Sequence, residues 1–352
     1  MMLPIALDAM GGDKAPGEIV AGARRAHELY GIPVILVGRP DEIGDPGPLE
    51  VFPASEVIAM DAEPGASVRR MKDSSLVRCA ELVRDGKASA MVSAGNTGAT
   101  MASALLRMGR IKGVNRPAVA TPIPVPGGTP TTLLDAGANS ECQPEWLVQF
   151  AQMGAAYARA RFGIAEPKVG LLSIGEEAGK GNTLVKETYG LLTTASGINF
   201  IGNVEGRDVM TDAADVIVTD GFTGNVVLKT LEGGMKTLVK ALFAAFTSTP
   251  EYQAATDILM PALLPLYATL DSENVGGALL LGVDGVCIIS HGSSSATAIE
   301  NALRTAADMV TADLVGKLTA AVAAPGAPAP EARAAETTAA ETTAAESTAP
   351  AT

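Results

Sequence analysis

The sequence predicts an α/β protein whose mostly parallel sheet is flanked by helices. The main observation is a repeated order of apolar run, polar glycine-containing loop and helical pattern, which is typical of parallel strands joined by helices. It recurs in the opening segment and in residues 88–108, 131–158, 168–192, 215–234 and 285–306. A second observation is composition: hydrophobic residues make up 47% of the 352 residues and aromatic ones only 4%, which suits helices packed closely on a sheet.

The loops that follow the predicted strands are the first place to look for function. In open α/β sheets, ligands bind at the edge where parallel strands end. We therefore expect every strand-to-helix loop to leave the same edge of the sheet, and the polar loops to line one cleft.

The opening run "IALDAMGGDKAP" ends a predicted strand at Asp8 and continues through Gly11 and Gly12. A tight turn is one interpretation, and an anion-holding loop is the other. None of the glycine loops is a Walker A sequence, and no clean GxGxxG follows the first strand, which disfavours nucleotide hydrolysis and ordinary dinucleotide binding. Small residues with Asn, Thr, Ser and Asp can instead present backbone N–H groups to an anion at helix N-termini.

Several of these loops carry side chains suited to acting on an anion. Lys180 lies between glycines in "SIGEEAGKGN" and could clamp a phosphate, although a solvated loop lysine is the alternative. In "TDGFTGN", Asn225 could donate to an oxyanion, and Asp220 is either a proton acceptor or a helix cap. His291 follows the apolar run "VCIIS", where a core or capping role is the alternative to function.

Metal, cofactor and covalent chemistry have little support. No group of His, Cys and carboxylates has metal-ligand spacing, so we expect no metal and no cofactor. Of three cysteines, Cys142 alone lies in a predicted cleft loop. An enzyme that uses thioesters could form an acyl-cysteine there, but no base is adjacent to Cys142 in the sequence. We therefore rank covalent catalysis by this thiol below direct transfer between substrates. The cysteine usage favours a reducing cytoplasm, and no secretory signal or membrane-spanning stretch is visible.

The charge is uneven. The chain carries −13 overall, whereas residues 69–116 hold ten basic and three acidic residues. Nucleic acid is a poor partner for so acidic a chain. A local basic face fits an acidic protein or a phosphorylated ligand, with solvated helix faces as the alternative.

Two segments differ from the repeated pattern. Residues 323–352 are rich in Ala, Thr, Glu and Pro and predict a disordered tail beyond a domain spanning 1–322. Residues 240–273 combine leucines with three prolines, which interrupt helices, and predict a short projecting helical hairpin. Its apolar side chains could face a membrane, a partner or a second copy of the chain.

Taken together, the motifs resemble the PlsX-type phosphate acyltransferases of bacterial phospholipid synthesis over about residues 3–316. The resemblance rests on "LDAMGGDKAP", "SAGNTGA", "LLDAGAN", "GLLSIGEE", "NVEGRD", "TDGFTGNVVLKTLEG" and "ISHGSS", in this order. It implies a fold similar to phosphate acetyltransferases and isopropylmalate dehydrogenase-like enzymes. It also implies transfer of a long-chain acyl group from acyl carrier protein to inorganic phosphate, giving an acyl phosphate for a membrane glycerol-3-phosphate acyltransferase.

The resemblance further implies a homodimer and a set of site residues. The catalytic residues would be Lys180, Asn225, Asp220 and His291. Substrate-binding residues would be Asp8, Gly11, Gly12, Asn96, Thr97, Asn139, Glu176, Asn182, Lys186, Thr223 and Ser293. The basic face then fits the strongly acidic acyl carrier protein, with docking through Arg69, Arg70, Lys72, Arg107, Arg110, Lys112 and Arg116. Contact with the inner face of the cell membrane would use Ile258, Leu259, Leu263, Leu264, Leu266 and Tyr267.

That membrane contact is expected to be weak or indirect, because residues 241–303 contain no Lys or Arg to attract anionic lipid. Two rival functions remain open at this point. A phosphate acetyltransferase-like enzyme would share the fold and use acyl-CoA. A non-enzymatic scaffold for lipid synthesis would need only the dimer and the hairpin.

Overall fold

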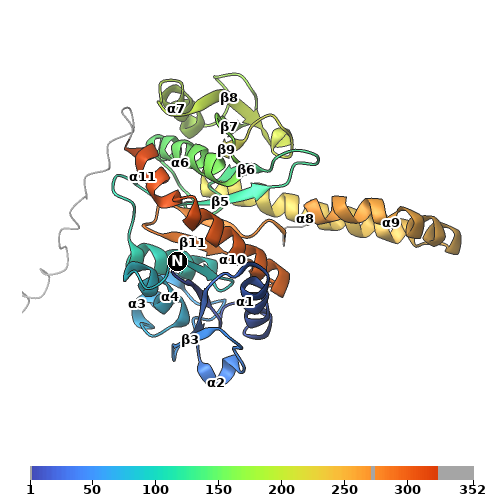
Figure 1. Ribbon diagram of the computed structural model, residues 1–352. Coiled ribbons are helices and arrows are strands. Elements are labelled where there is room, and N and C mark those ends of the chain that lie inside the picture. Colours follow the sequence, from blue (N-terminus) through green and yellow to red (C-terminus); the bar gives the residue numbers. More distant parts are fainter. Residues whose placement is uncertain (1, 271–273, 324–352) are drawn as a thin grey trace, which may run out of the picture.

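The computed structural model describes residues 2–270 and 274–323. In this part of the chain one eleven-stranded sheet crosses the whole body, in the order β3-β2-β1-β4-β11-β10-β5-β6-β9-β7-β8 (Figure 1). The strands are β1 (Ile5–Asp8), β2 (Val34–Gly38), β3 (Glu50–Pro53), β4 (Ala90–Ser93), β5 (Ala118–Ile123), β6 (Thr131–Leu134), β7 (Lys168–Ser173), β8 (Asn199–Glu205), β9 (Val216–Val218), β10 (Ala278–Leu281) and β11 (Val286–Ile289).

Helices connect most of these strands and cover the sheet. In the first half they are α1 (Gly17–Tyr30), α2 (Pro40–Ile43), α3 (Pro64–Arg70), α4 (Ser75–Arg84) and α5 (Thr97–Ser103), the last continuing as a π-helical turn, η1 (Ala104–Met108). In the second half they are α6 (Pro144–Phe162), α7 (Thr183–Leu192), the 3-10 turn η2 (Gly206–Asp208), α8 (Gly221–Phe246), α9 (Pro250–Leu270), α10 (Ala296–Thr311) and α11 (Leu314–Val322). The predicted α/β class with a mostly parallel sheet is confirmed.

The strands nevertheless run in two directions. Parallel pairings join β3, β2, β1, β4 and β11, and a second parallel group joins β6, β9, β7 and β8. Between the groups, β10 is antiparallel to β11 and to β5, and β5 is antiparallel to β6. The expectation that all strand-following loops leave one edge of the sheet is therefore wrong: β6, β9 and β7 run opposite to β1, β4 and β11.

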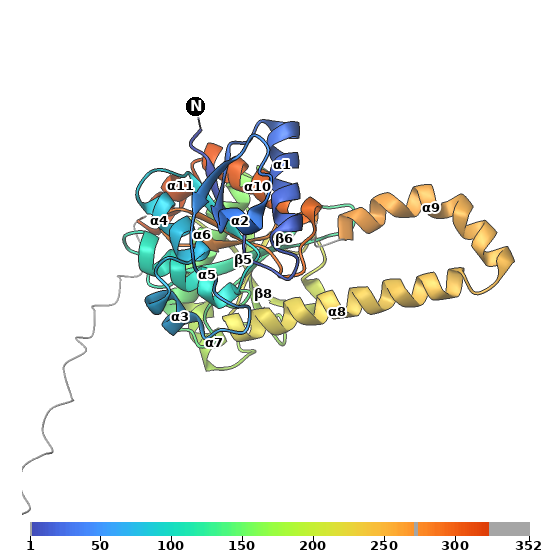
Figure 2. The same cartoon turned by 90° about the horizontal axis from the view of Figure 1, so that it is seen from below.

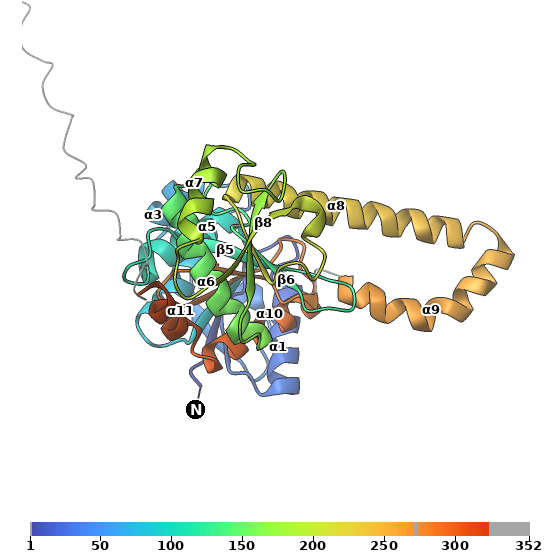
Figure 3. The same ribbon diagram turned by 90° about the horizontal axis from the view of Figure 1, so that it is seen from above.

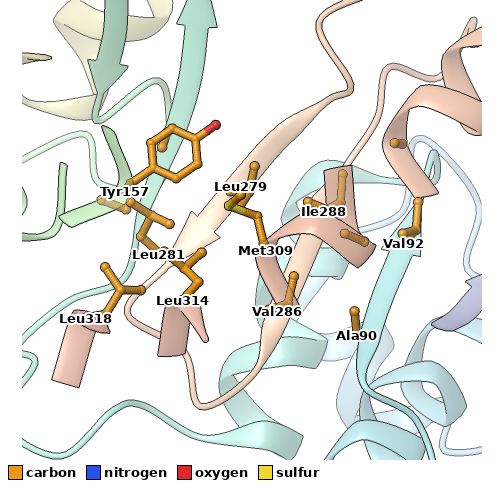
Figure 4. Close-up of a cluster of buried hydrophobic side chains, with 14 of the residues drawn as sticks. Ala90, Val92, Tyr157, Leu279, Leu281, Val286, Ile288, Met309, Leu314 and Leu318 are labelled. Atoms are coloured by element: carbon orange, nitrogen blue, oxygen red, sulfur yellow. The ribbon is translucent and has the colours of Figure 1, made fainter. Parts of the chain in front are cut away.

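The hydrophobic core lies on both faces of the sheet. Figure 4 shows how it is built on one face, where Tyr157 of α6, Met309 of α10 and Leu314 of α11 meet side chains of β10 and β11. The buried strands read as continuous apolar runs because helices cover them on both sides. This packing fixes the strand ends, and with them the loops that follow.

A long helical hairpin, α8 and α9, projects from the body, and its two helices lie apart over much of their length (Figures 2 and 3). It begins at Gly221, about twenty residues before the predicted start, because α8 runs on through Gly233 and Gly234. The expected interruption by proline is also wrong, since α9 continues past Pro261 and Pro265. An exposed helix can bend around a proline instead of ending there, and Figure 2 shows α9 bent. The hairpin residues 271–273, and all of the predicted tail beyond residue 323, lie outside the described residues.

Candidate active site

The first group of loops follows β1, β4 and β11, which are neighbours in the sheet. The N–H of Asp13 donates to Gly292 O at 2.7 Å, so the loop after β1 is joined directly to the loop after β11. Gly12 has φ +110°, and a Cβ there would lie 3.1 Å from Gly292 O and 3.2 Å from Ala94 O. Close approach of three loops thus requires glycine at this point.

A buried carboxylate, Asp8, organises these loops. It is 1% exposed and accepts hydrogen bonds from Ser93 Oγ at 2.7 Å and from Met10 N at 3.2 Å. Burial raises the pKa of Asp8, while the hydrogen bonds from Ser75 and Ser93 oppose that rise. A Cβ on Gly11 would lie 2.3 Å from Asp8 Oδ2. The hydrogen bond from Met10 N and the short distance to Gly11 both show that the Asp8 carboxylate faces its own loop and fixes the backbone there.

Asn96 lies after β4, and both the oxygen and the nitrogen of its carboxamide form hydrogen bonds within the protein. Its Oδ1 accepts from Ala99 N at 2.9 Å, and its Nδ2 donates to Met60 O at 2.8 Å and to Ala62 O at 3.1 Å. It therefore caps α5 and ties it to the segment before α3. Thr97 beside it is exposed.

His291 and Ser293, after β11, are also exposed and form a local pair. The Nδ1 of His291 lies 2.8 Å from Ser293 Oγ and accepts from Ser293 N at 3.3 Å. This contact orients the imidazole at the margin of the first loop group. Asp8, Gly11, Gly12, Asn96, Thr97, His291 and Ser293 thus all belong to the first group.

The second group of loops follows β6, β9 and β7, again neighbours in the sheet. Its centre is Asp135, a residue that we did not predict. It is fully buried and accepts hydrogen bonds from Val119 N, Gly137 N, Ala138 N and Asn139 N at 2.8–3.0 Å. Burial raises the pKa of Asp135, and these N–H donors oppose the rise.

Asn139 links Asp135 to the start of α8. Its Nδ2 donates to Asp135 Oδ2 and to Pro117 O, both at 2.8 Å, and its carbonyl accepts from Gly221 N at 2.7 Å. The side chain of Asn139 is therefore occupied within the protein. Its contact with substrate stays a prediction.

The first turn of α8 carries the other residues that we predicted here. Asp220 accepts from Thr223 N at 2.8 Å and from Thr223 Oγ1 at 2.7 Å, which is the capping geometry considered as the alternative. Asn225, one turn into the helix, is exposed, and its side chain lies 3.7 Å from the position of a Cβ on Gly137. Asn225 thus sits over the loop that Asp135 holds.

The loop after β7 carries Lys180, which is exposed. Its backbone N–H donates to Glu177 O at 3.0 Å, and its aliphatic stem crosses Gly175, where a Cβ would lie 2.9 Å from Lys180 Cγ. Glu176 pairs with Arg207 at 3.2 Å. At the helix that follows, Asn182 caps α7 through Val185 N at 3.0 Å, and Lys186 is exposed on its first turn. The substrate contacts predicted for Glu176, Asn182 and Lys186 stay predictions.

The twist of the sheet bears on how the two groups are placed. Adjacent strands rotate by about 20–25°, so the five steps from β4 to β9 amount to roughly 100–125°. Because β4 and β9 run in opposite directions within the sheet, this rotation leaves an angle of roughly 55–80° between the directions of the two strands. The loops after β4 and those after β9 therefore leave the sheet at an oblique angle to each other rather than in opposite directions.

Cys142, the considered nucleophile, is poorly suited to that role. Burial raises the pKa of its thiol to about 12, and its Sγ–H donates to Asn139 O at 3.6 Å. Since the thiolate is the reactive form, this thiol is almost entirely unreactive near neutral pH.

The predicted docking residues differ in their surroundings. Arg107 is partly buried, with its guanidinium 3.7 Å from Glu81; Arg110 donates to Asn115 O; and Arg116 lies over Trp146 at 4.8 Å. The rest of the set is exposed and forms no ion pair with the described residues, namely Arg69, Arg70, Lys72 and Lys112.

The predicted membrane residues are mostly exposed on α9. The exposed fractions are 79% for Ile258, 56% for Leu259 and 53% for Leu264, and Leu266 and Tyr267 are exposed as well. Leu263 is half-buried. In residues 2–270 and 274–323 no helix has the length and apolar character needed to span a bilayer.

Comparisons with known proteins agree with this architecture. A family model described as "Fatty acid synthesis protein" matches residues 3–317. The phosphate acyltransferase of Heliobacterium modesticaldum is 50% identical over 324 residues, covering 89% of this chain and 96% of that protein. The phosphate acyltransferase of a Nostoc species is 48% identical over 322 residues, covering 89% and 94%.

Solved structures show the same fold at low identity. A phosphotransacetylase from Streptococcus pyogenes matches with a TM-score of 0.61 at 16% identity, covering 88% of this chain and 94% of that one. The 4-hydroxythreonine-4-phosphate dehydrogenase of Klebsiella pneumoniae matches with a TM-score of 0.52 at 11% identity, covering 88% and 99%. These structures establish the fold alone, whereas the family model and the sequence relatives establish membership: the chain belongs to the phosphate acyltransferase family.

Proposed function

We propose that the protein transfers a long-chain fatty acyl group from acyl carrier protein to inorganic phosphate. The supporting observation is that the segments carrying two of the predicted catalytic residues follow adjacent strands. Lys180 lies on the loop after β7 and Asn225 lies near the start of α8, the helix that follows β9; β7 and β9 pair in parallel, with Leu171 opposite Val218. A cation and an amide donor are thereby placed at adjacent strand ends, where an anion can be held against an acyl carbonyl.

The chemistry needs little activation, because phosphate is already an anionic nucleophile near neutral pH. A phosphate oxygen attacks the thioester carbonyl carbon, the new C–O bond forms, and the C–S bond breaks. The products are the acyl phosphate and the thiol of the carrier, whose departing thiolate takes up a proton. No electron acceptor or metal enters this balance.

Each catalytic residue has a proposed part. Lys180 offsets the charge on phosphate and on the developing oxyanion, and Asn225 donates a hydrogen bond to it. His291 supplies the proton to the thiolate. Asp220 caps α8 and keeps the turn that carries Asn225 in place, and proton transfer is its second proposed part.

Release of free thiol from palmitoyl-acyl carrier protein tests the proposal. We expect release to require phosphate, to exceed release from acetyl-CoA, and to fall by at least about a hundredfold in Lys180→Ala. Lys317→Ala, on α11 and outside the site, serves as the matched control. Full turnover by a folded Lys180→Ala protein, or a preference for acetyl-CoA, would contradict the proposal.

The hairpin supports the proposed assembly. Exposed apolar side chains lie on both of its helices, among them Leu238 and Leu242 of α8 and Tyr252 of α9. We propose that a second copy of the chain covers these side chains and that the protein is a homodimer. Sedimentation velocity should show a dimer that Leu242→Asp weakens; a monomeric wild-type protein at micromolar concentration would contradict this.

The exposed apolar residues of α9 would let this cytoplasmic enzyme associate peripherally with the inner face of the cell membrane. There the acyl phosphate would pass to a membrane glycerol-3-phosphate acyltransferase. The lack of Lys and Arg in residues 241–303 favours weak or partner-dependent association.

A further inference from the structure

The motif "NVEGRD", residues 203–208, has no part in the proposed chemistry, yet it lies beside the Lys180 loop. It spans the end of β8, which pairs in parallel with β7, with Leu171 opposite Asn203 and Ser173 opposite Glu205. The chain that leaves β7 toward Lys180 therefore passes next to this segment.

One side chain of the motif makes a buried contact with the loop. Asn203 is 6% exposed, and its Nδ2 donates to Glu177 O at 2.9 Å. The same carbonyl oxygen accepts from Lys180 N at 3.0 Å. Because a carbonyl can only accept, the side-chain atom facing it must be the amide nitrogen, and the contact requires a donor at position 203. Glu177 O thus joins the strand side chain to the turn that ends at Lys180.

The loop itself is folded tightly around this point. Gly181 has φ +96°, and a Cβ there would lie 3.0 Å from Ser173 Oγ. The Lys180 stem already lies across Gly175. Because Lys180 N donates to the Glu177 carbonyl, a shift of that carbonyl would also move the backbone of Lys180.

A second contact of the motif is weaker. Arg207 reaches Glu176 at 3.2 Å and Glu205 at 3.0 Å, but Arg207 and Glu176 are about two-thirds exposed. Exposed ion pairs contribute little because water and salt screen them. The buried amide of Asn203 is the stronger constraint.

We propose that Asn203 is a positioning residue, which fixes the Glu177 carbonyl and so holds the ammonium group of Lys180 in place for the reacting phosphate. This inference rests on the proposed role of Lys180. Asn203 itself does not touch the substrate.

The test replaces the donor without changing its shape. In Asn203→Asp an ionised carboxylate would face Glu177 O and could not donate, so we expect kcat to fall about tenfold with little change in the KM for acyl carrier protein. A protonated carboxyl can donate again, so kcat of the variant relative to wild type should rise as the pH is lowered. Asn199→Asp, an exposed asparagine on the same strand, should show neither effect.

Two further measurements separate positioning from general folding. In a Lys180→Ala background, Asn203→Asp should cause little additional loss of kcat, because it acts through the missing side chain. Hydrogen exchange over residues 174–182 should become faster in Asn203→Asp. A full additional loss of kcat in the double variant would overturn the proposal.

Unchanged exchange in this segment would also overturn it. Exchange is independent of turnover, so it reports on the contact even if Lys180→Ala remains fully active. That last result would defeat the assigned role of Lys180, whereas unchanged exchange defeats the contact from Asn203.

Discussion

Asp8 and Asp135 occupy equivalent positions in two loops of similar sequence and hydrogen bonding. Each stands in the sequence Leu-Asp-Ala, Asp8 as the last residue of β1 and Asp135 directly after β6. Each is buried and accepts from the N–H two residues ahead, at 3.2 Å for Met10 and 3.0 Å for Gly137. The strand before each carboxylate pairs in parallel with a second strand, β1 with β4 and β6 with β9.

The paired strands continue the correspondence. Residues 93–98 read Ser-Ala-Gly-Asn-Thr-Gly and residues 219–224 read Thr-Asp-Gly-Phe-Thr-Gly. A Cβ on Gly95 would lie 3.2 Å from Asp8 Oδ2, and one on Gly221 would lie 2.9 Å from Asp135 Oδ2. In both halves a buried carboxylate therefore lies against a glycine at or just before the start of the next helix, and it limits how closely that helix can approach the carboxylate's own loop.

This close approach predicts a large difference between two glycines of α8. A Cβ on Gly224 would lie 1.9 Å from Asp135 O, whereas no atom of the described residues comes within 4 Å of one on Gly233. Gly224→Ala should therefore destabilise the protein by about 3 kcal/mol or more, because backbone must move. Gly233→Ala should stabilise it by about 0.5–1 kcal/mol, as expected in an exposed helix. Urea denaturation measures both, and equal effects would show that the two positions are equally open.

Cys142 gives a prediction for the pH dependence of thiol chemistry. With the pKa raised from 9.0 to about 12, the unfolded chain loses the thiol proton first, so this group lowers folding stability as the pH rises from about 9 to 12 and has no effect below 9. At pH 8 only about one thiol in ten thousand is ionised.

Alkylation of Cys142 by iodoacetamide should accordingly be slow at pH 8, and Cys142→Ser should keep full turnover. Peptide mass spectrometry and the thiol-release assay check these outcomes. Rapid modification coupled to loss of activity would favour an acyl-cysteine route instead.

The sequence was sufficient for the fold class but not for the direction of every strand. Residues 124–130 join β5 to β6, and so short a connection can only join antiparallel strands. The repeated strand–loop–helix pattern on both sides of this Pro- and Gly-rich connection nevertheless favoured an interpretation in which all strand-to-helix loops leave one edge of the sheet. The reversal of β6, β9 and β7 follows from this one connection.

Sequence reasoning selects candidate site residues where a residue type alone suggests the chemistry. Lys180 and Asn225 were selected because a cation and an amide in or beside glycine loops suit an anion, and their catalytic roles stay predictions. Asp135 was missed because its work is to accept backbone N–H groups, which depends on the folded loop; the signal was its match to Leu-Asp-Ala at Asp8. The full length of the first hairpin helix was not predicted: α8 begins at Gly221 and continues through Gly233 and Gly234.

The basic face predicts a charge-dependent KM for the acyl donor. Arg69 and Lys72 are exposed and near the end of α3, so Arg69→Glu with Lys72→Glu should raise the KM for acyl carrier protein about tenfold at low salt, with kcat unchanged. Added salt should raise the KM of wild type and have less effect on the variant, because there is less attraction to screen. Lys317→Glu is the control, and an equal response of all three proteins to salt would rule out this face.

The exposed residues of α9 predict a lipid contact that depends on apolar surface rather than charge. Ile258→Asp with Leu259→Asp should reduce flotation with vesicles, because both side chains are more than half exposed and their apolar area would be lost. Leu29→Asp, at an equally exposed leucine on α1, should have no effect. Since residues 241–303 lack Lys and Arg, raising the share of anionic lipid should change flotation little. Flotation that persists in the double variant would rule out these two residues of α9 as the lipid contact. Flotation that appears only when the membrane acyltransferase is present in the vesicles would assign recruitment to that partner.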